Sequence, residues 1–289
     1  MIKFRWMMMT MMLACALAMT AIACGGDDDD DDDATDVGTG TLNFYANGEE
    51  FGRNGFTTKD GWALSFDGFW ANVTGFTAYQ AAVTEKHPGH PHSDIPEGAS
   101  HVALVDSYWV NLAEGDDRTL VASMEDVPAG NYNYVNFVLD NTDEGDFAGN
   151  TIVWTGTATK DEDTVDFTIA LPEQMIFINC LQEVDDAEAG VVEDGGEGSV
   201  ELTLHADHLF GDADEPEDTV DGVNEFALGF EPFAEYALAN GNSIDTTGHD
   251  LSEFISDTEK QVFVTALYTI GHSGEGHCDY ETYSEDALE

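Results

Sequence analysis

Short runs of alternating apolar and polar residues dominate this chain, and glycine, asparagine, aspartate and proline separate them. Alternation is typical of strands with one buried face, and those four residue types bound strands at turns. No stretch of helical period separates the runs, so the sequence predicts a mainly β fold, an antiparallel β-sandwich. We expect strands at 41–45, 62–73, 101–112, 119–127, 131–139, 151–159, 164–171, 175–179 and 199–205.

Two local signals refine this prediction. Asn47-Gly48 follows the first run, and this pair is a strong signal for a two-residue hairpin turn. Gly68 interrupts the alternation of 62–73, after which the pattern resumes on the other parity, as at a β-bulge. We therefore expect a hairpin at 47–48 and a bulge at 68.

The last third of the chain has a different pattern. An acidic loop is expected at 206–224, and irregular or helical turns at 225–250. Ser256 and Glu259 fit a capping box, and apolar residues then recur at helical spacing up to Gly271, which is placed to close a helix. These features predict a C-terminal helical element, although the β-branched residues of 262–270 would also suit a strand.

The N-terminus has the organisation of a secretory signal peptide. Lys3 and Arg5 precede an apolar stretch, and the run Ala-Ile-Ala ends at Cys24. This run resembles the lipobox of bacterial lipoproteins, in which the cysteine is diacylated on sulfur and becomes the new N-terminus. The alternatives are an ordinary secretory peptide with an incidental cysteine, or cleavage before Cys15, which would leave eight apolar residues exposed.

The predicted domain organisation follows from this cleavage. Residues 1–23 form the signal peptide, 24–39 the acylated cysteine with an acidic tether, 40–280 the β-sandwich domain and 281–289 an acidic tail. The expected membrane partner is the lipid bilayer, reached through acylated Cys24, because no other apolar run is long enough to span it. Glycine after Cys24 favours the outer membrane, by analogy with lipoprotein sorting in some Gram-negative bacteria.

The charge balance excludes one class of partner. The chain has 59 acidic and 8 basic residues, and loss of Lys3 and Arg5 would leave 6 − 59 = −53. Phosphate binding needs clusters of lysine and arginine, so nucleic acid is not a partner. Adaptation to a saline habitat, where salt screens self-repulsion, is one interpretation of the acidity, and collection of cations is the other.

The four cysteines are expected to have three different roles. Cys15 leaves with the signal and Cys24 takes lipid, so Cys180 and Cys278 remain. An oxidising compartment favours a disulfide between them, which would close a loop of 278 − 180 = 98 residues. Ligation of a metal by two thiolates is the alternative.

Several short segments resemble one group of proteins. They are Val127-Pro-Ala-Gly-Asn-Tyr132, Asn47-Gly-Glu-Glu-Phe51, Asp60-Gly-Trp62, the stretch 201–210 and the tail 271–278. Together these resemble uncharacterised bacterial lipoproteins that have a prealbumin-like β-sandwich. The resemblance implies the fold and lipoprotein status, and it carries over no established activity.

Histidines form the candidate functional site. His205 and His208 flank Asp207 at the end of a strand, and His272 and His277 lie in a glycine-rich loop beside Cys278. A Cys180–Cys278 disulfide would bring that loop toward the strand region. Four neutral imidazoles suit zinc or copper, with Asp207 orienting one ring from the second shell. The alternative is that these histidines only cap neighbouring backbone groups.

A third histidine group and the catalytic motifs complete the prediction. His87, His90 and His92 lie in a proline-rich loop that would bind metal weakly.

The sequence has no G-x-S-x-G, H-E-x-x-H or phosphate-binding glycine loop. We therefore expect an envelope lipoprotein with a metal site and no enzymatic activity. A purely structural or adhesive lipoprotein and a zinc hydrolase are the alternatives.

Overall fold

The computed structural model describes residues 38–81, 94–115, 117–182, 189–216, 219, 222–274 and 276–282. The chain divides into two compact units, Met1–Asp36 and Val37–Glu289, and all described residues belong to the second. The predicted signal peptide, Cys24 and His87, His90 and His92 lie outside the described residues.

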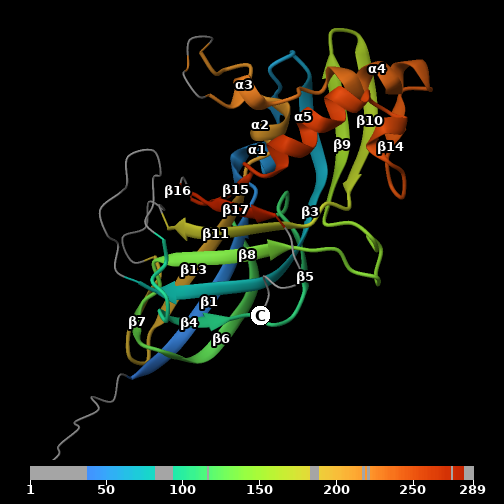
Figure 1. Ribbon diagram of the computed structural model, residues 1–289. Coiled ribbons are helices and arrows are strands. Elements are labelled where there is room, and N and C mark those ends of the chain that lie inside the picture. The colour runs from blue at the N-terminus through green and yellow to red at the C-terminus, as the bar shows by residue number, and fades with distance from the viewer. Residues whose placement is uncertain are drawn as a thin grey trace, which may run out of the picture. The chain divides into compact units, whose positions relative to one another are not determined.

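Two large sheets contain most of the strands (Figure 1). The five-stranded sheet has the order β16 (Gly276–His277), β15 (Gly271–Ser273), β13 (Glu197–Leu204), β1 (Thr39–Asn47), β6 (Thr119–Pro128). The main path of the ten-stranded sheet is β14 (Ser243–Asp245), β10 (Asp163–Leu171), β9 (Ile152–Lys160), β3 (Ala63–Gln80), β8 (Tyr134–Leu139), β11 (Met175–Leu181), β17 (Asp279–Thr282).

Shorter strands and the helices complete the fold. β2 (Phe56–Thr57), β4 (Ser100–Ala103) and β5 (Tyr108–Asn111) also pair with β3, and β7 (Gly130–Asn131) pairs with β12 (Val191–Val192). The helices are α1 (Glu49–Asn54), α2 (Asp207–Phe210), α3 (Val223–Phe226), α4 (Glu231–Ala239) and α5 (Asp257–Leu267), with a 3-10 turn, η1, at Leu251–Glu253. Among the described residues, no helix combines the length and apolar content needed to cross a bilayer.

Aromatic side chains connect the two large sheets. The Phe44 ring of β1 meets the Phe76 ring of β3 edge-on, with centroids 5.1 Å apart, and Phe76 in turn lies 6.2 Å from Phe137 of β8. All three side chains are fully buried. Because the inward residues of both sheets share one core, the fold is a mainly β sandwich with helices, which confirms the predicted fold class.

A second set of buried rings attaches the helices to the end of the sandwich that contains β9, β10 and β14 (Figure 1). Phe230, which precedes α4, contacts Phe167 of β10 at 5.3 Å and Phe210 of α2 at 6.0 Å. Phe210 also meets Phe263 of α5 at 5.7 Å. Helices α2, α4 and α5 are therefore held by buried apolar side chains that share one core.

The predicted helix at the C-terminal end is confirmed. The Ser256 side chain accepts a hydrogen bond from the Glu259 N–H, and the Glu259 carboxylate accepts one from the Ser256 N–H, so the capping box is complete. The helix ends at Leu267 with Tyr268 as its cap, and Gly271 instead begins β15. A side chain at Gly271 would collide with the Phe177 ring, because a Cβ there would lie 2.2 Å from Cδ1.

Two pairings depart from the antiparallel rule. β1 runs parallel to β13, and β14 runs parallel to β10. The predicted hairpin at Asn47-Gly48 is wrong, since α1 follows β1 there. The Asn47 side chain accepts a hydrogen bond from the Glu49 N–H, and Glu49 takes the left-handed conformation with φ of 58°, so the chain turns into a helix.

The predicted β-bulge at Gly68 is confirmed, because the β3–β9 register shifts between Phe66 and Gly68. The expected strands 101–112 and 131–139 are each divided, into β4 with β5 and β7 with β8. The acidic loop at 206–224 contains α2, which is buried. β17 continues to Thr282, two residues beyond the predicted end of the domain at 280.

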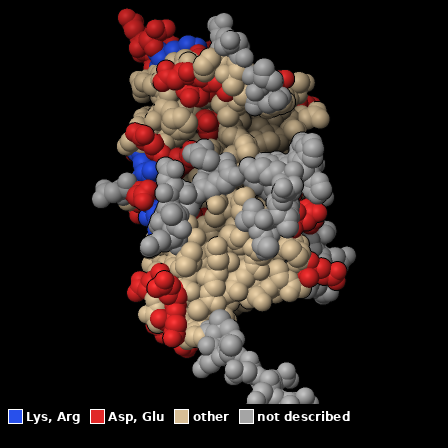
Figure 2. Space-filling view, turned by 90° about the vertical axis from the view of Figure 1, so that its left-hand side faces the viewer, with Lys and Arg blue, Asp and Glu red and all other residues tan. Residues whose placement is uncertain are grey.

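Acidic side chains lie in several separate groups on the face drawn in Figure 2, with few basic residues among them. No single acidic patch covers that face. The charge on that face is therefore distributed, and salt adaptation stays a prediction.

Candidate metal centre

The disulfide predicted from the sequence is present. Cys180 of β11 and Cys278 are bonded, with Sγ atoms 2.02 Å apart. Cys278 lies between β16 and β17 in the sequence, and β17 pairs with Met175–Ile178 of β11. The C-terminal histidines are therefore fastened to the strand that carries Cys180, which rules out thiolate ligation of a metal by this pair.

Strand pairing brings the two predicted histidine groups together. His205 follows β13 and donates its N–H to the Ile270 carbonyl, and His208 lies in α2. His272 of β15 is opposite Thr203 of β13, and His277 of β16 is opposite His272. The four imidazoles that the sequence placed in two segments therefore lie at one place.

Three of the four imidazoles form a compact cluster. His205, His208 and His272 each offer a donor atom, and these atoms lie within 4.8 Å of one another. The His205 and His272 rings stack with centroids 3.9 Å apart, and His208 meets His272 edge-on at 5.0 Å. This buried histidine group can hold a metal ion, because closing each N–metal distance to about 2.0–2.1 Å requires only small side-chain movements.

His277 is less closely associated than the other three. Its ring is 4.3 Å from His272 and 6.4 Å from His208 between centroids, and its side chain is exposed. It therefore lies at the rim of the cluster.

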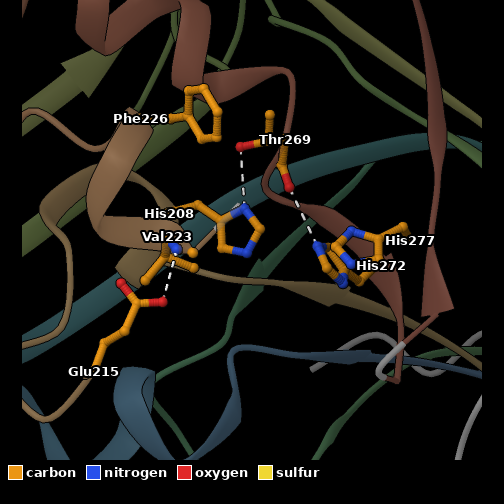
Figure 3. A pocket seen from close by; sticks show the side chains of 8 residues that line it. His208, Glu215, Val223, Phe226, Thr269, His272 and His277 are labelled. Carbon is orange, nitrogen blue, oxygen red and sulfur yellow. Dashed lines mark hydrogen bonds between the residues drawn. The ribbon is translucent and has the colours of Figure 1, made fainter. Parts of the chain in front are cut away.

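A pocket of about 390 Å³ opens next to the cluster (Figure 3). Its lining comprises His208, Glu215, Gly222, Val223, Phe226, Thr269, His272 and His277. In Figure 3 the His208 ring faces His272 and His277 across this space. A metal bound at the cluster would therefore be reachable from solvent.

Hydrogen bonds that Thr269 accepts from two of the rings indicate which of their nitrogens carry protons. The Thr269 hydroxyl donates to the Ala266 carbonyl, so its oxygen accepts from His208 Nδ1 at 3.0 Å. The Thr269 carbonyl accepts from His272 Nε2 at 3.2 Å. Lone pairs are consequently left on His208 Nε2 and His272 Nδ1, and His272 Nδ1 is buried without a hydrogen-bond partner.

His205 also has a ring nitrogen without a partner. Its Nε2 is buried and makes no hydrogen bond. Because a neutral imidazole carries one lone pair, each of the three rings has one nitrogen available to a metal.

Burial keeps these imidazoles neutral. Desolvation, with the neighbouring histidines, lowers the pKa of His205 to about 3 and that of His208 to about 4. The same causes hold the pKa of His272 well below its usual range. Neutral imidazole is the form that binds metal, so proton competition is weak at neutral pH.

Asp207 lies near the cluster without hydrogen-bonding to it. Its Oδ1 is 4.0 Å from His205 Nδ1, beyond hydrogen-bond distance, and it is buried without a partner. Burial raises the pKa of Asp207 to about 6. The second-shell role predicted for Asp207 stays a prediction.

Sequence reasoning missed two residues of this centre. Thr269 follows α5, and nothing in its local pattern distinguishes its hydroxyl from those of other threonines. Glu49 lies far from the histidines in sequence, yet its Oε1 is 3.2 Å from His205 Nε2. Only the parallel β1–β13 pairing, which the sequence did not indicate, brings Glu49 to the cluster.

We expect Thr269→Val to lower the affinity for Zn²⁺ by about 10–100-fold, because the His208 tautomer loses the acceptor that fixes it. Thr269→Ser should restore wild-type affinity. Thr265→Val is the matched control, since the Thr265 hydroxyl makes a similar bond to the Gln261 carbonyl away from the cluster. Competition titration with a zinc chelator measures all three, and equal affinities for Thr269→Val and wild type would contradict this role.

The metal-free protein should lose stability in mild acid. Around pH 5, above the native pKa of His208 and below that of Asp207, the unfolded chain holds about three more protons on His205, His208 and His272, and the native chain about one more on Asp207. The net excess of two protons in the unfolded state makes the free energy of unfolding fall by roughly 2–3 kcal/mol per pH unit as the pH decreases.

This acid dependence is checked by urea unfolding of the metal-free protein at pH 5, 6 and 7. His272→Phe removes one of the titrating groups and should reduce the slope by about 1.4 kcal/mol per pH unit. Because every surface carboxylate is shared by the two proteins, the difference between their slopes isolates the cluster. Identical slopes would show that His272 is not held neutral by burial.

Comparisons of this chain with protein families, with curated proteins and with solved structures find no match. The chemistry of the site is therefore the basis for assigning a function.

Proposed function

We propose that this protein is an exported, lipid-anchored envelope protein that binds one transition-metal ion, zinc or copper, through His205, His208 and His272, with His277 at the rim. The observation that carries the proposal is the buried, unpartnered lone pair of His272 Nδ1 within the three-histidine cluster. A buried nitrogen without a partner is costly unless something binds it, and a metal ion satisfies all three rings at once.

The proposed role is binding without catalysis. The hydrolase alternative invokes a carboxylate that acts as a base beside the ion. Glu215 is the acidic residue of the described pocket lining, and its two oxygens accept from the Val223 and Asn224 N–H groups. Its carboxylate is thus engaged in holding the start of α3, which argues against Glu215 as the base of a hydrolase and supports a binding role.

The location in the envelope rests on sequence and on the disulfide. The run from Lys3 to Cys24 resembles a lipoprotein signal with its lipobox, and Gly25 after the cysteine favours the outer membrane. The Cys180–Cys278 bond supports export, because disulfides persist in oxidising compartments. Mass spectrometry of the native N-terminus tests the anchor, and an unmodified Cys24 or an intact Met1 would refute it.

Metal analysis tests the binding proposal. Protein purified from its natural membranes without chelator or histidine tag should contain about one equivalent of zinc or copper. Removal of the ion should lower the unfolding temperature, and addition of Zn²⁺ at 100 times its dissociation constant should restore about 2.7 kcal/mol. A metal-free protein whose unfolding temperature ignores both ions would leave the structural or adhesive alternative.

A further inference from the structure

Glu49 is placed beside the histidine cluster by the sheet itself. Asn47, the last residue of β1, pairs with Thr203 of β13 in parallel register, and Glu49 and His205 each follow two residues later. Glu49 holds the left-handed backbone conformation, with φ of 58°, and its N–H donates to the Asn47 side chain at 2.8 Å. A residue other than glycine is uncommon there, and such strain is concentrated at functional sites.

The contact between Glu49 and His205 is close, but it is not a hydrogen bond. Glu49 Oε1 and His205 Nε2 are 3.2 Å apart. A buried ring nitrogen without a hydrogen-bond partner therefore lies next to a carboxylate oxygen. A metal ion bound to both atoms would satisfy that nitrogen, which is otherwise costly to bury.

The distance between these two atoms fits shared coordination. In a tetrahedral site with metal bonds of about 2.0–2.1 Å, neighbouring ligand atoms lie about 3.3–3.4 Å apart. The observed 3.2 Å is close to this separation. The Glu49 side chain is partly exposed, at 23 %, which gives its carboxylate room to follow the ion toward the other two histidines.

We propose that Glu49 supplies the fourth ligand of the metal centre, so that the ion is held by three imidazole nitrogens and one carboxylate oxygen. This inference rests on the proposed metal-binding function and identifies its ligand class. A carboxylate oxygen is a harder donor than a fourth imidazole and adds a negative charge, so the set favours a divalent ion such as Zn²⁺ over Cu⁺. His277 is then outside the coordination sphere.

The test compares Glu49→Gln with Glu50→Gln, which removes the same charge from the next residue of α1. Titration of metal-free protein with Zn²⁺ should show that Glu49→Gln weakens binding by more than about 100-fold, beyond the 10–100-fold typical of second-shell changes. Glu50→Gln should bind within about 3-fold of wild type, because the Glu50 side chain is exposed and accepts a hydrogen bond from Asn54. Urea unfolding of the metal-free proteins checks that both variants fold.

The Co²⁺-loaded proteins separate a ligand from an orienting group. Loss of the carboxylate ligand should shift the visible absorption bands of bound Co²⁺ in Glu49→Gln and leave them unchanged in Glu50→Gln. Unchanged bands with a 10–100-fold loss of affinity would overturn the assignment, because Glu49 would then only orient His205. Wild-type affinity in Glu49→Gln would overturn it as well. Failure of the wild-type protein to bind either ion would instead refute the metal-binding function itself.

Discussion

Replacing His272 with phenylalanine is expected to reduce the affinity for Zn²⁺ by more than about 100-fold, which corresponds to at least about 2.7 kcal/mol of binding free energy. His272 is the centre of the cluster, since its ring contacts those of His205, His208 and His277. Phenylalanine keeps a ring to stack on His205 and removes both nitrogens. The remaining two histidines cannot fill the coordination sphere of a tetrahedral ion.

The matched control for this variant is His249→Phe. His249 is exposed and lies beside Glu253 and Phe254, outside the cluster. Zinc titration should give wild-type affinity for His249→Phe, and circular dichroism should show that both variants are folded. If the two variants bound zinc equally well, binding would occur elsewhere, for example at the acidic surface.

Removing the disulfide is expected to have the largest effect on stability. The Cys180–Cys278 bond closes a loop of 98 residues, and in the chain-entropy model its loss costs about 4–5 kcal/mol of unfolding free energy. Most domains are stable by only about 5–15 kcal/mol, so this loss is a large fraction of the total. Urea unfolding of the double variant Cys180→Ala, Cys278→Ala measures it at neutral pH.

The disulfide also positions half of the metal centre. Cys278 follows His277 directly, and its N–H donates to the Gly271 carbonyl next to His272. The double alanine variant should therefore bind Zn²⁺ more weakly than wild type, and reduced wild-type protein should match the variant in both measurements. A stability loss below about 1 kcal/mol would show that strand pairing alone holds the C-terminal segment in place.

Alternation predicted the strands because each has one face in a shared core. Phe44, Phe76 and Phe137 lie on three separate strands and meet in the sandwich. Periodicity in a single strand states which face is buried, and gives no information about which neighbour it pairs with. For this reason the parallel β1–β13 pair, and the helix in place of a hairpin after Asn47, were not predicted.

The candidate site shows the same division between local and distant information. The histidines could be found from the sequence because imidazole is a common metal ligand, and the two remaining cysteines indicated how their segments meet. Thr269 and Glu49 were missed because their significance is geometrical. The Thr269 hydroxyl acts as an acceptor for His208 only because it donates to Ala266, and Glu49 reaches His205 only through the register of two strands.

A crystal of the protein grown with Zn²⁺, measured at the zinc absorption edge, tests the central claim most directly. The anomalous difference map should show one strong peak about 2.0–2.1 Å from nitrogens of His205, His208 and His272. Peaks confined to surface carboxylates, with no density among the three imidazoles, would contradict the metal centre described above.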